Sequence, residues 1–205
     1  MHPVFRVLSL ALLPSALLAA PAAADWAYEP PPVGAVVRYD DERVSRVATA
    51  EEETIVLEEE VGGAEEVHAY RTWLLQVSLA RPSMGVTLTL EAGEGEEVLD
   101  AWPLEPGESV DLPYRVLNGE TLLAEGELTA TYEGEETLEV PAGSFTAHKL
   151  VHDLTFRRED GGEVRTLQTV WHDAETGLIL RLDFETWQPE GSVDGSRVAT
   201  EVELP

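Results

Sequence analysis

The chain has 205 residues, of which 40 are Asp or Glu and 13 are Lys or Arg, so its formal net charge at pH 7 is −27. Nucleic-acid binding depends on basic side chains that release counterions from phosphates, so this composition argues against it. The same charge opposes docking on anionic lipid. The sequence has no cysteine, which excludes disulfides, thiol nucleophiles, cysteine-ligated metals and lipid-modified cysteine anchors.

Residues 1–24 have the three parts of a secretory signal peptide. Arg6 gives the start a positive charge, and Ala22 and Ala24 supply the small side chains that a signal peptidase requires. The apolar run between them, residues 7–20, contains Pro14 and is shorter than the roughly 20 residues of a membrane-spanning helix. We therefore expect cleavage after Ala24, export to a bacterial periplasm and no stable membrane anchor.

Residues 25–33 are expected to form an extended arm, because three consecutive prolines, residues 30–32, cannot continue a sheet interior. From residue 34 onward, apolar and polar side chains alternate with a period of two, which is typical of antiparallel strands with one buried face. We expect a single domain over residues 34–205. In residues 67–79 the alternation predicts a buried face of Val67, Ala69, Trp73, Leu75, Val77 and Leu79, with His68, Tyr70 and Gln76 on the opposite face.

Turn signals divide this domain into short strands. Asn118-Gly119 is a typical hairpin dipeptide, Gly62-Gly63 separates two apolar runs, and residues 160–162 and 173–177 mark two further turns. The pattern predicts an all-β fold of roughly eleven strands, without an amphipathic helix. A single curled antiparallel sheet of that size must cover its apolar face, either as an open half-barrel or as a closed barrel.

Two segments carry a family resemblance. They are LEVPAGSFTA at residues 138–147 and TVWHDAETGLILR at residues 169–181, preceded by Trp102-Pro103-Leu104 and Gly107. This order resembles uncharacterised exported bacterial proteins of the domain-of-unknown-function type, which in turn resemble the half-barrels of LolA/LolB-like lipoprotein carriers. The resemblance covers roughly residues 102–185 and concerns the fold, because the similar proteins have no catalytic set to carry over. Pro141-Ala142-Gly143 also has a simple structural interpretation, as a tight turn between two strands.

The sequence offers no converging set of reactive groups. His148 and His152 are four residues apart on an expected strand, about 13 Å, so one zinc ion cannot bind both without a bend. His172 could approach His152 across the turn at residues 160–162, but only in some registers. A nucleophile elbow and phosphate-binding glycine loops are absent. Acidic runs such as Glu58, Glu59 and Glu60 are expected to be solvated. We therefore expect no metal, no cofactor and no catalytic residues.

These observations favour a non-catalytic periplasmic binding or carrier module for an apolar ligand, such as an acyl chain or a lipoprotein. The side chains expected to line or underlie its apolar face are Trp73, Phe145, Trp171, Leu180 and Phe184. For each of them taken singly, plain core packing is favoured over ligand contact. The alternative is an exported structural or assembly protein that binds a protein partner through its sheet edge or acidic face, without a ligand. A hydrolase is the less favoured third class.

Overall fold

Alternating side chains along almost the whole chain produce strands, and each strand pairs with its neighbours in sequence. The computed structural model describes residues 30–51, 54–71, 76–92, 104–158 and 161–205; the expected signal peptide, Trp73, Trp102 and Pro103 lie outside these ranges. The described strands are β1 (Val36–Tyr39), β2 (Val44–Glu51), β3 (Thr54–Val61), β4 (Ala64–Arg71), β5 (Gln76–Arg81), β6 (Val86–Ala92), β7 (Ser109–Asn118), β8 (Thr121–Val140), β9 (Gly143–Arg158), β10 (Glu163–Asp173), β11 (Ile179–Gln188) and β12 (Gly191–Glu203).

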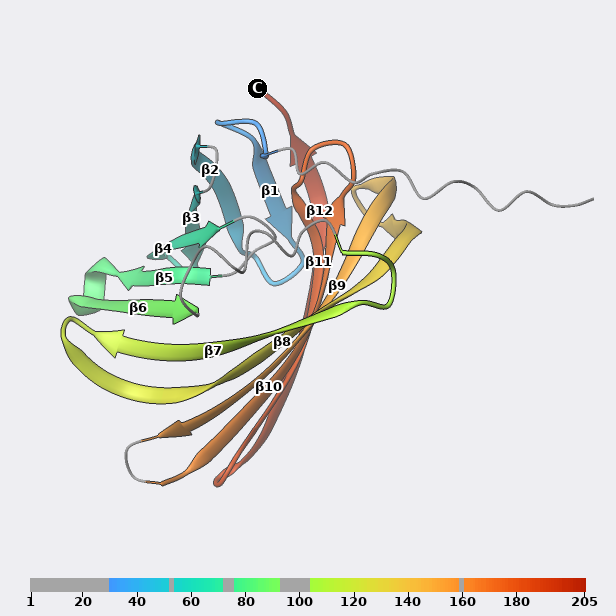
Figure 1. The fold of residues 1–205 in the computed structure, drawn as a ribbon. Helices are drawn as coiled ribbons and strands as arrows, with labels where there is room; N and C mark the ends of the chain where they lie inside the picture. Colours follow the sequence, from blue (N-terminus) through green and yellow to red (C-terminus); the bar gives the residue numbers. More distant parts are fainter. Residues whose placement is uncertain (1–29, 52–53, 72–75, 93–103, 159–160) are drawn as a thin grey trace, which may run out of the picture.

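The twelve strands form one closed antiparallel barrel (Figure 1). β1 pairs with β2 on one side and with β12 on the other, and this second pairing closes the barrel. The all-β prediction is confirmed, with one strand more than expected. The only helical element in the described residues is the 3₁₀ turn η2 (Pro82–Met84), and none of their helices has the length and apolar character needed to cross a membrane.

The predicted turns lie between strands. Gly62 and Gly63 join β3 to β4 with φ values of 57° and 81°, a left-handed backbone that glycine adopts without steric cost. Asn118-Gly119 joins β7 to β8, and residues 174–178 join β10 to β11. Pro141 and Ala142 form the turn between β8 and β9. Local turn chemistry was therefore a sound guide to where the strands end.

The predicted face of residues 67–79 is wrong. The stretch contains two antiparallel strands, β4 and β5, and His68 is buried opposite Leu57. Tyr70 packs against the main core, whereas Val67 and Ala69 on the other face are only half-buried. Glu59 was expected to be solvated but is 2% exposed. The interior accepts these polar groups because other polar side chains pair with them there.

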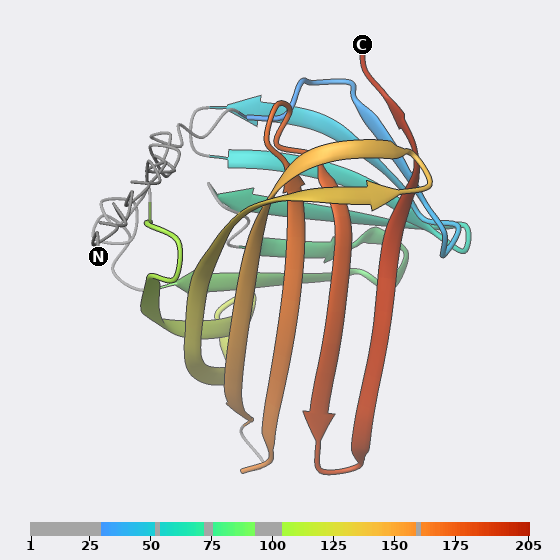
Figure 2. The same cartoon turned by 90° about the vertical axis from the view of Figure 1, so that its right-hand side faces the viewer.

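The end of the β8–β9 hairpin folds across the sheet. Figure 2 shows it passing over β10 and β11 toward β12, where the Ala142 N–H donates to the Ala199 carbonyl at 3.2 Å. Trp171 is tied to the hairpin because its indole N–H donates to Glu136 Oε1 at 2.6 Å. Where the sheet is covered on both faces, buried and exposed side chains no longer alternate. Four consecutive side chains are therefore buried there, namely Val170, Trp171, His172 and Asp173.

Gly126 on β8 lies where β9 leaves no room for a side chain. A Cβ at this position would lie 1.9 Å from the Thr155 carbonyl oxygen on β9, so no side chain fits. Its neighbours in register, Tyr114 and Phe156, have ring centroids 5.5 Å apart. The missing side chain therefore allows the sheet to bend while the two rings meet in its second core cluster.

Replacing this glycine tests the bend. We expect Gly126→Ala to lower the free energy of unfolding by about 2–3 kcal/mol, because the methyl group forces the backbones of β8 and β9 apart. Urea unfolding measures the loss. Gly62→Ala is the control: its added methyl meets nothing within 4 Å, and the positive φ costs only about 1 kcal/mol. Equal losses in the two variants would contradict the close approach.

Candidate functional site

An apolar hollow lies between the first three strands and the start of β11. The space inside it that a water-sized sphere can occupy is about 20 Å³. The lining residues are Pro31, Val37, Tyr39, Ser45, Val47, Ile55, Leu57, Gly177, Leu178 and Ile179. Small-molecule sites in proteins are concave and mostly apolar, with a few polar groups that fix orientation. The composition of this lining fits that description.

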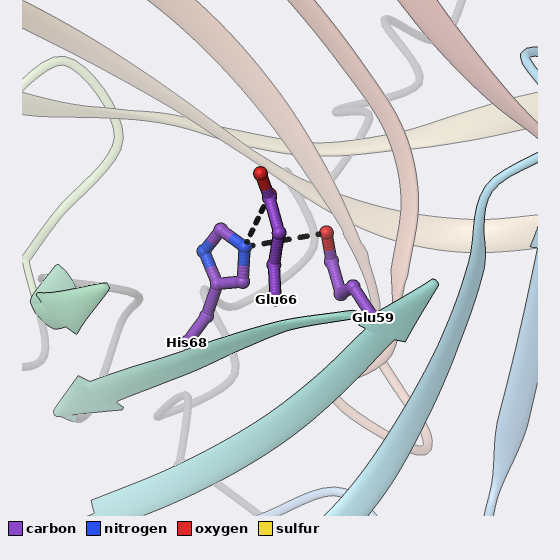
Figure 3. Close-up of side chains that lie close together, drawn as sticks. All are labelled: Glu59, Glu66 and His68. Atoms are coloured by element: carbon purple, nitrogen blue, oxygen red, sulfur yellow. Dashed lines mark hydrogen bonds and ion pairs between the residues drawn. The ribbon is translucent and has the colours of Figure 1, made fainter. Parts of the chain in front are cut away.

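A cluster of charged side chains lies next to the hollow, on the same face of β3 as the lining residue Leu57. Figure 3 shows three of its members, Glu59, Glu66 and His68. The buried carboxylate of Glu59 on β3 accepts a short hydrogen bond from Arg43 Nη1, and Arg197 Nη1 lies 3.8 Å from the same Oε2 atom. Glu66 on β4 pairs with Arg81 at 2.8 Å. His68 Nε2 lies 3.2 Å from Glu66 Oε2 and 3.5 Å from Glu59 Oε2. We call these six residues the charged cluster; their carboxylates and guanidinium groups largely neutralise one another.

Glu59, Glu66 and His68 could in principle bind a cation, since their candidate ligand atoms all lie within 4.8 Å of one another. However, Arg43 Nη1 already contacts Glu59 and lies 3.6 Å from Glu66 Oε2. His68 Nδ1 lies 3.0 Å from Gln76 Nε2, an amide donor, which places the imidazole proton on the Nε2 that faces the carboxylates. The arrangement is therefore better suited to an internal ion-pair network than to a metal centre.

The electrostatics of the cluster keep it charged. Burial raises the pKa of Glu66, but hydrogen bonds from Arg81 and His68 outweigh burial and hold that pKa below its usual value. For Arg43, burial lowers the pKa, yet the bond to Glu59 raises it above the normal guanidinium value. Both side chains therefore stay ionised at neutral pH, which is the condition for a stable buried pair.

Tyr39 connects the hollow to the charged cluster. Its ring lines the hollow, its hydroxyl donates to the Ile179 carbonyl at 2.9 Å, and the Arg197 guanidinium lies 5.4 Å from the ring centroid. Burial raises the pKa of this phenol, so the hydroxyl remains a donor. A ligand in the hollow would thus have a mostly apolar wall with two polar side chains, Tyr39 and Ser45.

Three buried histidines lie on β9 and β10. His148 pairs in register with His172, whereas His152 pairs with Gln168, so the register does not place His172 opposite His152. Residues 148–152 are strand, as expected. Desolvation lowers the pKa of His148 and His152 to about 4 and that of His172 to about 3. All three are therefore neutral at pH 7.

The structure places the predicted ligand-contact residues mainly in the core. Leu180 is fully buried, and Trp171 is buried between Lys149 Nζ, 5.6 Å from its ring, and Arg181 Cζ, 4.8 Å away. Phe145 packs against the same main core, to which the lining residues Val37, Ile55 and Leu178 also belong. These three predicted residues share a core with the lining residues but do not themselves line the hollow.

Phe184 lies elsewhere, half-buried on β11 opposite Gly195, and Trp73 is outside the described residues. Sequence reasoning missed Tyr39, Arg43, Glu59 and Arg197. The β2–β3 pairing already brings Arg43 close to Glu59, but Arg197 reaches them only when β1 pairs with β12, and no local pattern predicts that pairing. The one sequence feature that pointed to this cluster was weak: Arg43 and Arg46 are basic residues in a chain that has few of them.

The chain was compared with protein families, curated proteins and solved structures. No family model matches the chain, and no curated protein matches it. A protein described as exported, with a YmcC-like fold, from Bacteroides fragilis is 15% identical; the match covers 85% of this chain and 98% of that one, with a TM-score of 0.47. The hypothetical lipoprotein YmcC of Escherichia coli is 12% identical over 80% of this chain and 88% of its own, with a TM-score of 0.48.

A third solved structure, described as a lipoprotein from Parabacteroides distasonis, is 12% identical. The match covers 85% of this chain and 97% of that one, with a TM-score of 0.39. None of the three descriptions mentions LolA or LolB, so that part of the sequence resemblance stays a prediction.

Removing the buried carboxylate should destabilise the barrel. We expect Glu59→Gln to lower the free energy of unfolding by about 3–5 kcal/mol, because Arg43 and Arg197 lose their buried counter-charge. Glu60→Gln on the same strand is exposed and should change it by less than about 0.5 kcal/mol. Denaturant titration of both variants makes the comparison. If the Glu59→Gln variant were as stable as the Glu60→Gln variant, the network would not be structural.

The buried histidines predict a loss of stability in acid. In the unfolded chain these histidines take up a proton near pH 6.5, whereas folded His152 and His172 remain neutral down to pH 5. Each of the two histidines therefore lowers the free energy of unfolding by about 2 kcal/mol between pH 8 and pH 5. The His152→Gln variant should therefore show a smaller decrease in unfolding free energy over this range than the wild type. Urea titrations at both pH values test the difference. An unchanged pH dependence in the variant would mean that His152 is protonated in the fold.

Proposed function

We propose that the chain is a non-catalytic, exported binding or carrier module that holds an apolar chain, such as an acyl group, in the hollow between β1–β3 and Leu178. The observation that carries the proposal is the lining itself. Val37, Val47, Ile55 and Leu57 converge there with Leu178 and Ile179, and the hydroxyl of the lining residue Tyr39 is already hydrogen-bonded to the Ile179 carbonyl.

Burial of the ligand supplies the driving force. Each methylene transferred from water contributes about 0.8 kcal/mol. Because the hollow has a volume of only about 20 Å³, its lining must move apart to admit the chain, and this opening and the ordering of the ligand oppose binding. The proposed periplasmic location follows from the signal peptide expected at residues 1–24. The reactive groups described above favour binding over catalysis: arginines occupy the carboxylates of the charged cluster, so this cluster offers the hollow no free general base.

A fluorescent fatty acid tests the proposal. Dansyl-labelled undecanoate should bind the wild-type protein with increased emission. In Leu178→Trp the indole fills the hollow, so the affinity should fall at least 10-fold. Leu123→Trp, at an exposed position on β8, is the matched control and should bind as the wild type does.

Circular dichroism and thermal melting establish that both variants fold. Equal binding by the folded Leu178→Trp and wild-type proteins, or no binding by the wild type, would refute the proposed site. Native mass spectrometry of protein purified from periplasm provides a second measurement, in which a co-purifying lipid should appear for the wild type and be lost in Leu178→Trp.

A further inference from the structure

The first part of β12, residues 191–197, has one edge that pairs with no described strand. β11 pairs with β12 from Gln188↔Gly191 to Arg181↔Val198, but β1 covers only the part of β12 from Ala199 to Glu203. Among the described residues, no strand pairs with the other side of residues 191–197. Figure 2 shows this part of β12 continuing well beyond β1 with no other strand on its outer side. The barrel is thus closed at one end and has a free edge at the other.

The backbone groups on this edge can be assigned from Val198. Its N–H donates to Asp40 Oδ1 and its carbonyl accepts from the Asp40 N–H, both at 3.0 Å, so Val198 faces away from β11. Backbone groups in an antiparallel strand alternate in direction with a period of two. Ser192, Asp194 and Ser196 therefore direct their N–H and carbonyl groups to the open side, where they are available for a further strand.

The two faces of the edge differ in chemistry. On one face Val193 is 53% exposed, next to Gly195, where the ring of Phe184 lies only 2.6 Å from the position a Cβ would take. On the other face Asp194 and its register neighbour Glu185 are both exposed. A strand laid beside β12 would therefore meet apolar surface on one face and carboxylates on the other.

We propose that the edge of β12 at residues 191–197 binds an extended segment of a partner protein whose side chains alternate between basic and apolar. Strand addition of this kind draws its affinity from main-chain hydrogen bonds and its specificity from alternate side chains. Basic residues of the segment would pair with Asp194 and Glu185, and apolar residues would cover Val193 and Phe184. The net charge of −27 also speeds encounter with a basic partner.

A second copy of this chain is a poorer occupant of the same edge. Antiparallel pairing of two β12 strands about Asp194 would bring identical carboxylates opposite each other, which is destabilising. Two chains of charge −27 also repel at long range. The inference is independent of the apolar hollow, because Leu178 and the edge of β12 belong to different parts of the barrel.

A seven-residue peptide tests the edge. The probe is the fluorescein-labelled peptide Lys-Val-Lys-Val-Lys-Val-Lys. The whole mature chain is added to it in increasing amounts, and binding is measured by fluorescence anisotropy. Ser192→Pro removes one outward N–H from an edge position that tolerates proline, and it should weaken binding at least 10-fold. Ser192→Ala keeps the N–H and should bind as the wild type does. Asp194→Lys should also weaken binding of the basic peptide at least 10-fold.

The composition-matched peptide Val-Val-Val-Lys-Lys-Lys-Lys separates strand addition from simple charge attraction. It should bind at least 10-fold more weakly than the alternating peptide. Circular dichroism of each variant verifies folding, and Asp194→Lys keeps the test valid should Ser192→Pro not fold. Equal binding of the two peptides, or full binding to folded Ser192→Pro, would overturn the proposal. A dimer in sedimentation velocity that Ser192→Pro abolishes would also overturn it, in favour of a second copy.

Discussion

The pairing of β1 with both β2 and β12 is the constraint on which the rest of the structure depends. This four-residue strand closes the barrel and places Val37 and Tyr39 in the wall of the hollow. It also brings Arg197 of β12 near Glu59 of β3, which no other pairing would achieve. Because β1 is short, the same strand leaves the remaining edge of β12 uncovered. The position and short length of β1 thus account for the hollow, the charged cluster and the free edge of β12.

The barrel accommodates its many carboxylate side chains in two ways. Most carboxylates are on the outer faces of strands, where water and salt screen them. Two carboxylates are buried among the described residues: Glu59 is matched by Arg43 and Arg197, and Asp173 accepts hydrogen bonds from Thr176. Buried pairs of this kind contribute little net stability compared with apolar packing, but breaking one is costly. The cluster therefore fixes the geometry of one end of the barrel, beside a hollow that is otherwise apolar.

The limits of prediction follow from the same geometry. Period-two alternation and glycine turns predicted the all-β fold and located the ends of β3, β7 and β10, because strand and turn preferences are local. The faces of β4 were assigned wrongly, since His68 and Tyr70 are polar by composition yet point inward toward partners from other strands. The hairpin at residues 136–142 crosses the sheet and binds Trp171 through Glu136, a contact that no local pattern predicts.

The sequence by itself determined that this chain alternates in short strands, is strongly acidic, has no cysteine chemistry and offers no local catalytic motif. These properties depend on composition and on neighbours within a few residues. Only the tertiary structure decided that the sheet closes, which side chains line the hollow, that Glu59 lies beside two arginines and that β12 keeps an open edge. Each of these requires contacts between residues far apart in the chain, such as Arg38 with Glu201, and the register of such contacts is set by the whole sheet closing at once.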